Sequence, residues 1–215
     1  MSVNLLSSNH ENEAVFQAVE EAQPDLLIFL ELNSWWHQKL QAQYGTTYPF
    51  HQSEVREDNF GISLYSKVPL QDFEILELED QIPLLLASFE NEGHPFHLLA
   101  LHLIPPVNKR RSAQRDSSLA ALPKVLASLP HAVMVVGDFN ATPWSYPFRH
   151  LLAETELHDS SRGFGLQPTW PTYFPLLGIP IDHCLYSSGV RIVNREVGAK
   201  TGSDHRPLIV DFQVQ

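Results

Sequence analysis

The sequence has one cysteine, Cys184, and no apolar run near the ~18 consecutive residues that a membrane span requires. One cysteine cannot form a disulfide within the chain, so we expect Cys184 to be a small core residue. The first residues, Met1 to Asn4, lack the basic and apolar regions of a signal peptide. A soluble domain of unknown location is therefore expected, and a membrane anchor ahead of residue 1 in a longer parent protein is compatible with the sequence.

Basic residues are also scarce, with 14 Lys and Arg against 25 Asp and Glu and a formal net charge of -11. This charge opposes the counterion release that supplies most of the non-specific affinity for DNA, so long duplex DNA is an unlikely partner. Clustered carboxylates can instead be neutralised by a hard divalent cation such as Mg²⁺.

The 215 residues, 43% of them hydrophobic, are enough for one domain with a substantial core. No linker or repeat divides the chain, so a single domain, residues 1–215, is expected. Hydrophobic periodicity predicts helices at residues 11–22 and 109–128. Strands are predicted at residues 26–30, 60–66, 83–90, 96–103, 132–136, 181–187, 191–196 and 207–212, the second to fourth of them forming a meander. A mixed α/β domain built around packed sheets follows.

Polar residues stand where several of these strands end, which is where sites are usually built. In Gly137-Asp138-Phe139-Asn140, the acid and the amide are two residues apart and would project from the same side of an extended segment. Together they could hold a nucleophilic water and a phosphoryl oxygen, although a simple Asx-type turn is an alternative.

The segment Gly202-Ser203-Asp204-His205-Arg206-Pro207 places an acid beside a histidine in a polar turn before a strand. Such a pair can bind a metal ion and stabilise charge that develops on a phosphate. Taken alone, it could also be an ordinary surface loop.

The whole ordered set of motifs resembles the endonuclease/exonuclease/phosphatase superfamily, which includes DNase I, apurinic endonucleases, neutral sphingomyelinases and inositol polyphosphate 5-phosphatases. The resemblance spans nearly the whole chain and is carried by Asn4, Leu30-Glu31, Asn59-Phe60-Gly61-Ile62, Leu101-His102, Gly137-Asp138-Phe139-Asn140, Ile181-Asp182-His183 and Ser203-Asp204-His205-Arg206-Pro207. It implies a four-layer α/β sandwich of the DNase I-like type, with two packed sheets, helices outside and a site at one rim.

The resemblance also implies roles for these residues. Glu31 would ligate Mg²⁺ or Mn²⁺, with Asn4 and Asp204 completing the metal site. Asp138 would orient or deprotonate the attacking water. Asn140 would position the water and the phosphate. His205 would stabilise the transition state, with Asp182 as its orienting partner.

Further residues have weaker support. His102 matches a position used for a phosphate contact or a general acid, although it could simply cap a strand, and Asn59 is either a phosphate-side or a turn residue. The aromatic residues Trp144 and Trp170 could line a substrate groove or pack between loop and sheet. For Arg115 a surface salt bridge is favoured over a phosphate contact, and packing roles are expected for His183 and Cys184.

The function predicted from the sequence is metal-dependent hydrolysis of a phosphate ester by an activated water. The acidity favours a phosphorylated small molecule, a lipid head group or a short nucleic acid as substrate, and a monomer is expected. The alternatives are an endo- or exonuclease and a non-catalytic interaction module with the same fold. The one compact basic cluster, Lys109-Arg110-Arg111, is predicted to be a solvated helix face.

Overall fold

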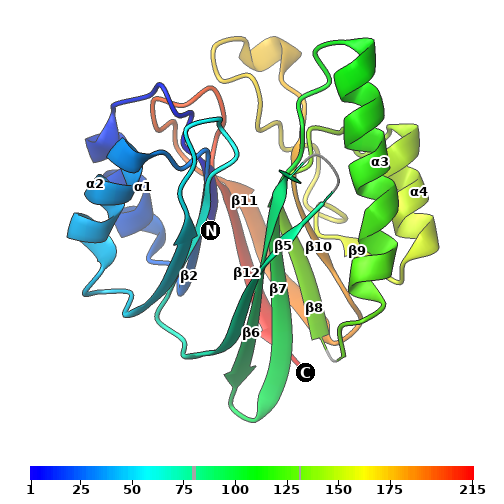
Figure 1. Cartoon of the computed structure of the whole chain (residues 1–215), viewed down its shortest axis with the longest axis horizontal. Helices are drawn as coiled ribbons and strands as arrows, with labels where there is room; N and C mark the ends of the chain where they lie inside the picture. The colour runs from blue at the N-terminus through cyan, green and yellow to red at the C-terminus, as the bar shows by residue number, and fades with distance from the viewer. Residues whose placement is uncertain (79–80, 131) are drawn as a thin grey trace.

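The computed structural model describes residues 1–78, 81–130 and 132–215. Two six-stranded sheets form the centre, and four α-helices in the described residues cover their outer faces (Figure 1). The predicted four-layer α/β sandwich is therefore confirmed.

The first sheet has the strand order β11-β12-β1-β2-β4-β3. Strands β1 and β2 are parallel, and every other neighbouring pair is antiparallel. Its strands are β1 (Ser2–Asn4), β2 (Leu26–Leu30), β3 (Phe50–Glu54), β4 (Ile62–Ser66), β11 (Val190–Val197) and β12 (Leu208–Val214).

The second sheet has the order β5-β6-β7-β8-β10-β9 and again contains one parallel pair, β7 and β8. Each sheet thus has a parallel pair flanked by antiparallel strands. The strands of this sheet are β5 (Leu70–Glu77), β6 (Pro83–Asn91), β7 (His94–His102), β8 (Ala132–Asp138), β9 (His158–Asp159) and β10 (Asp182–Tyr186).

Two helices lie on each outer face (Figure 1). Helices α1 (Asn12–Ala22) and α2 (Ser34–Tyr44) cover the first sheet, and α3 (Lys109–Leu126) and α4 (Tyr146–Glu154) cover the second. A 3-10 helix, η2 (Pro175–Leu177), lies in the loop that follows β9. Every helix within the described ranges is too short or too polar to cross a lipid bilayer.

The side-chain alternation of the strands builds the layers. On β2, Leu26, Ile28 and Leu30 face the second sheet, whereas Leu27 and Phe29 pack under α1 and α2. The strands of the second sheet alternate in the same way between the central core and the core beneath α3 and α4. Because successive side chains of a strand point to opposite faces, an unbroken apolar run is what a strand buried on both faces requires.

Most predicted elements are present, with ends displaced by a few residues. Helix α1 and strand β2 agree with the predicted ranges, and β8 extends two residues further, to Asp138. The predicted meander was wrong: β4 pairs with β2 and β3 in the first sheet, and the meander is formed by β5, β6 and β7 in the second. Two α-helices and three strands were not predicted, namely α2, α4, β3, β5 and β9.

Candidate active site

The candidate site lies where the carboxyl ends of the two parallel strand pairs meet. Asn4 ends β1 and Glu31 directly follows β2, while His102 ends β7 and Asp138 ends β8. Parallel strands end at the same edge of a sheet, and the two sheets are packed face to face, so these four side chains share one rim. On the neighbouring antiparallel strand, Asp182 is paired in register with Asp138.

The chain turns sharply on either side of Asp138. Gly137 has a φ of 139°, and a Cβ at this position would lie 2.0 Å from the Leu101 carbonyl oxygen. Only glycine fits so close to the neighbouring strand. Residue 137 therefore lets β8 approach β7 closely beside the carboxylate.

The extended geometry predicted for Asp138 and Asn140 was wrong, although the two side chains do converge. Asn140 has a φ of 47°, so the chain passes through a left-handed turn after β8. The Asn140 backbone N–H donates to Asp138 Oδ1 at 2.8 Å, which is the Asx-type turn considered as the alternative. Asn140 Nδ2 lies 3.2 Å from Asp138 Oδ2 and also donates to the Leu103 carbonyl at 2.8 Å. The turn therefore fixes the Asn140 side-chain amide against the Asp138 carboxylate.

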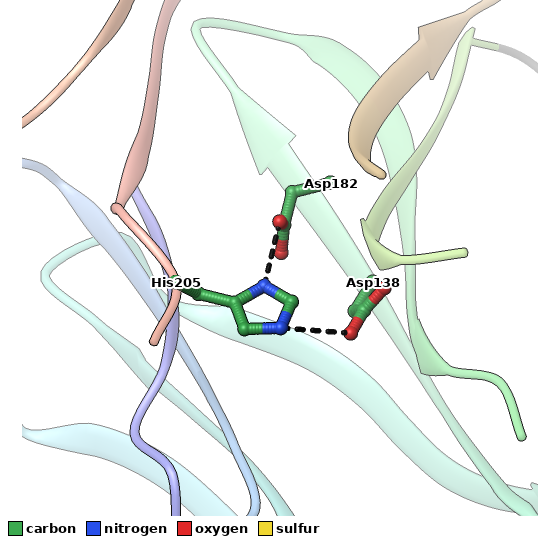
Figure 2. Close-up of side chains that lie close together, drawn as sticks. All are labelled: Asp138, Asp182 and His205. Atoms are coloured by element: carbon green, nitrogen blue, oxygen red, sulfur yellow. Dashed lines mark hydrogen bonds and ion pairs between the residues drawn. The ribbon is translucent and has the colours of Figure 1, made fainter. Parts of the chain in front are cut away.

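His205 lies between two carboxylates (Figure 2). Its Nδ1 donates to Asp182 Oδ2 at 2.8 Å, and its Nε2 lies 3.6 Å from Asp138 Oδ2. The ring is 5% exposed, and both acids are buried more deeply. The Ser203 hydroxyl accepts the His205 backbone N–H at 3.1 Å, which fixes the loop that carries the ring.

The charges of Asp138, Asp182 and His205, which form the triad of this site, depend on one another. Burial alone would raise the pKa of Asp182, but attraction to His205 and hydrogen bonds from His205 and Thr169 outweigh burial and lower it. Burial likewise opposes the charged form of His205, but Asp182 and Asp138 outweigh it and raise its pKa to about 10. Burial, with repulsion from Asp182 and Glu31, raises the pKa of Asp138. At neutral pH, His205 is therefore a buried cation held by Asp182.

His102 lies on the other side of Asp138. Its Nδ1 donates to the Asn59 carbonyl at 3.0 Å, so Nε2 faces Asp138 Oδ2 at 3.6 Å. Burial, together with repulsion from His205, lowers the pKa of His102 to about 4. At neutral pH, His205 is thus charged and His102 is neutral, and Asn59 contributes through its backbone carbonyl.

Glu31 and Asn4 form the part of the site nearest the first sheet. Glu31 has a φ of 61°, is 9% exposed, and its Oε2 accepts the Ser7 amide at 3.0 Å. Burial raises the pKa of Glu31 despite the hydrogen bonds from Ser7 and Asn4. Asn4 Nδ2 also lies 3.4 Å from Asp138 Oδ2, so Asn4 links the two acids.

Asp204 is close enough to Glu31 to repel it electrostatically, and its Oδ2 accepts the indole N–H of Trp170 at 3.0 Å. Trp170 therefore lies at the site, next to a predicted metal ligand. Trp144 is 55% exposed, and the structure gives it no contact with the predicted site among the described residues. The two tryptophans that the sequence singled out thus differ in position.

A family model described as the endonuclease/exonuclease/phosphatase family matches residues 1–205. The chain belongs to this family. The family includes phosphodiesterases, phosphatases and nucleases, and its fold is typically hydrolytic.

Solved structures share the fold at low sequence identity. TDP2 of D. rerio complexed with single strand DNA product has a TM-score of 0.83 and 17% identity, with 99% of this chain and 97% of that chain covered. An endonuclease/exonuclease/phosphatase from Beutenbergia cavernae has a TM-score of 0.77 and 16% identity, with 99% and 70% covered. These likenesses show the fold alone.

A curated relative, UPF0294 protein VP2298 of Vibrio parahaemolyticus, is 32% identical over 97 residues. The match covers 45% of this chain and 33% of that protein, so the compared region spans about a third of the relative.

Enzymes of the endonuclease/exonuclease/phosphatase family commonly use divalent metal ions, and the donors at this site fit one. Glu31, Asn4 and Asp204 offer oxygen atoms, the ligands that Mg²⁺ and Mn²⁺ prefer. The raised pKa values of Glu31 and Asp138 mark carboxylates for which nearby positive charge is insufficient. A cation beside Glu31 would relieve this imbalance.

A second group of possible ligands is Asp138, Asp182 and His205, whose ligand atoms lie within 4.8 Å of one another. Both ring nitrogens of His205 already point at carboxylates, and the raised pKa keeps both protonated. A protonated ring nitrogen has no lone pair for a metal ion. The hydrogen-bonded triad therefore accounts for this group better than a metal cage.

Sequence reasoning missed or misplaced three residues that support the site. The Ser7 amide binds Glu31, and the Thr169 hydroxyl bonds to Asp182 and accepts its backbone N–H at 3.2 Å. Arg115 was predicted in a surface salt bridge; it does pair with Asp116, but it is 9% exposed and also donates to the Asn140 carbonyl at 2.6 Å. Backbone and hydroxyl contacts of this kind leave no pattern in a sequence.

The packing roles predicted for His183 and Cys184 and the exposed basic cluster are confirmed. His183 is buried, and its Nε2 donates to the Ala141 carbonyl at 2.8 Å, which gives it a packing role. Cys184 is a buried free thiol in the core between the sheets. The basic cluster at residues 109–111 is exposed at the start of α3.

Proposed function

We propose that this chain hydrolyses a phosphate ester by attack of a water molecule, with Mg²⁺ or Mn²⁺ as cofactor. The observation that carries the proposal is the triad at the rim. A buried imidazolium, held at 2.8 Å by Asp182, faces Asp138, which also accepts a hydrogen bond from the Asn140 side-chain amide. A cation and an acceptor fixed side by side suit a reaction in which negative charge develops at phosphorus while water loses a proton.

In this proposal Glu31, Asn4 and Asp204 hold the metal ion. When bound, the ion supplies Lewis-acid polarisation of a phosphoryl oxygen. Asn4 bonds to Glu31 and contacts Asp138, so it keeps the metal side of the site aligned with the water side.

Asp138 orients the attacking water and accepts its proton. Once ionised, this carboxylate is a stronger base than an exposed aspartate because its pKa is raised, and the positive charges of His205 and of a bound cation favour the ionised form. Asn140, fixed by the Leu103 carbonyl, positions the water and a phosphate oxygen.

His205 donates a hydrogen bond from Nε2 to a phosphate oxygen, and Asp182 holds the ring in the orientation that this requires. The P–O bond to the leaving group breaks as water attacks, and the leaving oxygen takes a proton from solvent. His102 lies on the phosphate side with Nε2 directed into the site. A bound phosphate anion would favour protonation of His102 and so create a second donor. Asn59 places His102 through its carbonyl, and Trp170 lines the substrate side.

The test is hydrolysis of bis(4-nitrophenyl) phosphate with added Mg²⁺ or Mn²⁺. Asp138→Asn should lower kcat by about 10²–10⁴-fold, the usual range for loss of a general base. His205→Gln should lower it by about 10²–10³-fold. Asp211→Asn and His158→Gln are matched controls, since both side chains are exposed and lie outside the site. Wild-type turnover by the Asp138 variant would sink the proposal.

Nuclease activity is the alternative within the same chemistry. TDP2 of D. rerio, which shares the fold, was crystallised with single strand DNA product. A short nucleic acid therefore stays among the candidate substrates, beside phosphorylated small molecules and lipid head groups. The charge of -11 ranks long duplex DNA last, and efficient nicking of a plasmid at low salt would reverse this order.

A non-catalytic interaction module is the alternative from another class. Such a module gains nothing from a buried cation between two acids, because burying charges costs stability. Calorimetric titration with Mg²⁺ separates the enzyme from the interaction module, since a module without the metal site should show no heat of saturable Mg²⁺ binding. We further propose that residues 1–215 act as one domain and as a monomer, which sedimentation of the purified chain would test.

A further inference from the structure

A groove of about 410 Å³ opens beside the candidate site. Asn140 forms part of its wall, so the groove and the site are continuous. Most of the other lining side chains are apolar: Pro105, Pro106, Val107, Trp170, Ile179 and Ile181. An apolar cavity of about 150 Å³ already holds a benzene ring, so this groove is large enough for a substantial apolar group.

Among the described residues that line the groove, no cation is free to bind a phosphate chain. Arg115 is the cationic side chain among its lining residues, and its guanidinium is committed to Asp116 and to the Asn140 carbonyl. Nucleic-acid grooves carry basic side chains along the path of the phosphates. The charge of this groove therefore favours an uncharged, apolar occupant.

The walls of the groove are fixed by hydrogen bonds. The Trp170 indole donates to Asp204 at 3.0 Å, and the Trp170 backbone pairs with Ile179 in both directions. Opposite them, the turn at Asn140 is held by Leu103 and Arg115. A preformed groove binds its ligand without the cost of ordering the protein.

We propose that this groove receives the apolar substituent of a phosphodiester substrate, namely the substituent that stays on phosphorus. The inference rests on the proposed function. In an in-line displacement, the attacking and leaving oxygens stand on opposite sides of phosphorus. Asp138 and Asn140 hold the water, and the groove begins at Asn140, so the leaving group points away from it. The substrate is therefore a diester with one apolar retained group rather than a monoester.

The test compares methyl 4-nitrophenyl phosphate with hexyl 4-nitrophenyl phosphate, which share a leaving group and similar intrinsic reactivity. The hexyl ester should be preferred about tenfold in kcat/KM, which corresponds to ~1.4 kcal/mol or roughly two buried methylene groups. Thr142→Phe, which fills the groove, should abolish the preference while the methyl ester is still hydrolysed. Thr46→Phe, at an exposed position elsewhere, should leave the preference unchanged.

A second variant keeps the test valid if Thr142→Phe does not fold. Val107 is 71% exposed, so Val107→Ser should fold and should reduce the preference severalfold. Val193, 52% exposed on β11, gives the matched control Val193→Ser.

Calorimetric binding of hexyl methyl phosphate and dimethyl phosphate separates the groove from the chemistry. Tighter binding of the hexyl compound that is lost in Thr142→Phe would support the groove even if no ester were hydrolysed, and the proposed function would then fail alone. Hydrolysis of both esters at equal kcat/KM, with equal binding, would overturn the groove and leave the proposed function standing. If neither ester were hydrolysed and the two phosphates bound equally, both the groove proposal and the proposed function would be overturned.

Discussion

Replacing Asp182 with Asn tests the charge arrangement of the triad directly. The carboxylate lies 2.8 Å from His205 Nδ1, and both groups are buried. At an effective dielectric constant of about 20, two unit charges at this separation attract by ~6 kcal/mol, an upper limit before desolvation is counted. The rise of the His205 pKa to about 10 corresponds to ~5 kcal/mol in favour of the charged ring. The second value also includes the cost of burying the charged ring and the attraction of Asp138.

The sign of the pH dependence follows from the raised pKa. Because the folded chain binds the His205 proton more tightly than the unfolded chain does, the stabilisation is fully present below the ordinary histidine pKa of about 6.5 and is lost as pH rises through about 10. Asp182→Asn should therefore lower the free energy of unfolding by about 3–5 kcal/mol at pH 6. The difference from the wild type should shrink toward pH 10. Urea denaturation at several pH values measures both.

Asp182→Asn should also lose activity in molecules that remain folded. Without the carboxylate, the His205 ring is neither held in one orientation nor kept protonated at neutral pH. We therefore expect kcat to fall by about 10²–10³-fold. The His205 resonance, followed by NMR, should titrate well below its wild-type pKa. Asp211→Asn, an exposed acid-to-amide change, serves as the control. If Asp182→Asn kept kcat within twofold and left the His205 titration unmoved, the reasoning about the triad would be refuted.

Three further changes test other parts of the site. Glu31→Gln should raise the Mg²⁺ concentration for half-maximal activity at least tenfold, with much of kcat recovered at saturating metal, because a neutral amide is the weaker ligand; a metal titration measures this. Gly137→Ala should cost more than ~4 kcal/mol of stability in thermal unfolding, since its Cβ would meet a carbonyl oxygen at 2.0 Å, whereas Gly93→Ala, with open space around it, should cost about 1 kcal/mol. Arg115→Met should lower kcat about tenfold at nearly constant KM, because the turn at Asn140 loses a hydrogen bond of 2.6 Å.

The sequence predicts those elements whose side chains are buried in a regular pattern. Strand β2 is apolar at every position and buried throughout, so its range could be predicted without error. Edge strands β3 and β5 have partly exposed faces, and β3 consists of the mixed residues FHQSE, so no alternation marks it as a strand. Helix α2 buries three residues spaced four apart, Trp36, Leu40 and Tyr44, but the positions three residues from them on the helix are polar, so the apolar stripe is narrow. Its Asn33 cap was the available signal.

The structure brings together residues that the motifs single out, but the contacts among them could not be predicted. Asp138, Asp182 and His205 follow from motifs, yet nothing in the sequence states that Asp182 would pair with Asp138 across β10 and β8. The Asx turn at residue 140 replaced the expected extended geometry because the backbone amide competes for the carboxylate. Local hydrogen bonds of this kind depend on the fold, which must exist before they form.

The acidity of the chain and the cationic histidine of the site act on different length scales. At physiological ionic strength, charges interact over about 8 Å, so under the proposed function a small phosphodiester bound within the rim would respond to His205 and the proposed metal ligands rather than to the net charge of -11. A long polyanion would also lie along the surface outside the rim, on a chain in which 25 Asp and Glu outnumber 14 Lys and Arg, and in the adjoining groove the cationic Arg115 is already paired. Local attraction can therefore coexist with repulsion of long nucleic acid, and substrate size becomes part of the selectivity of the site.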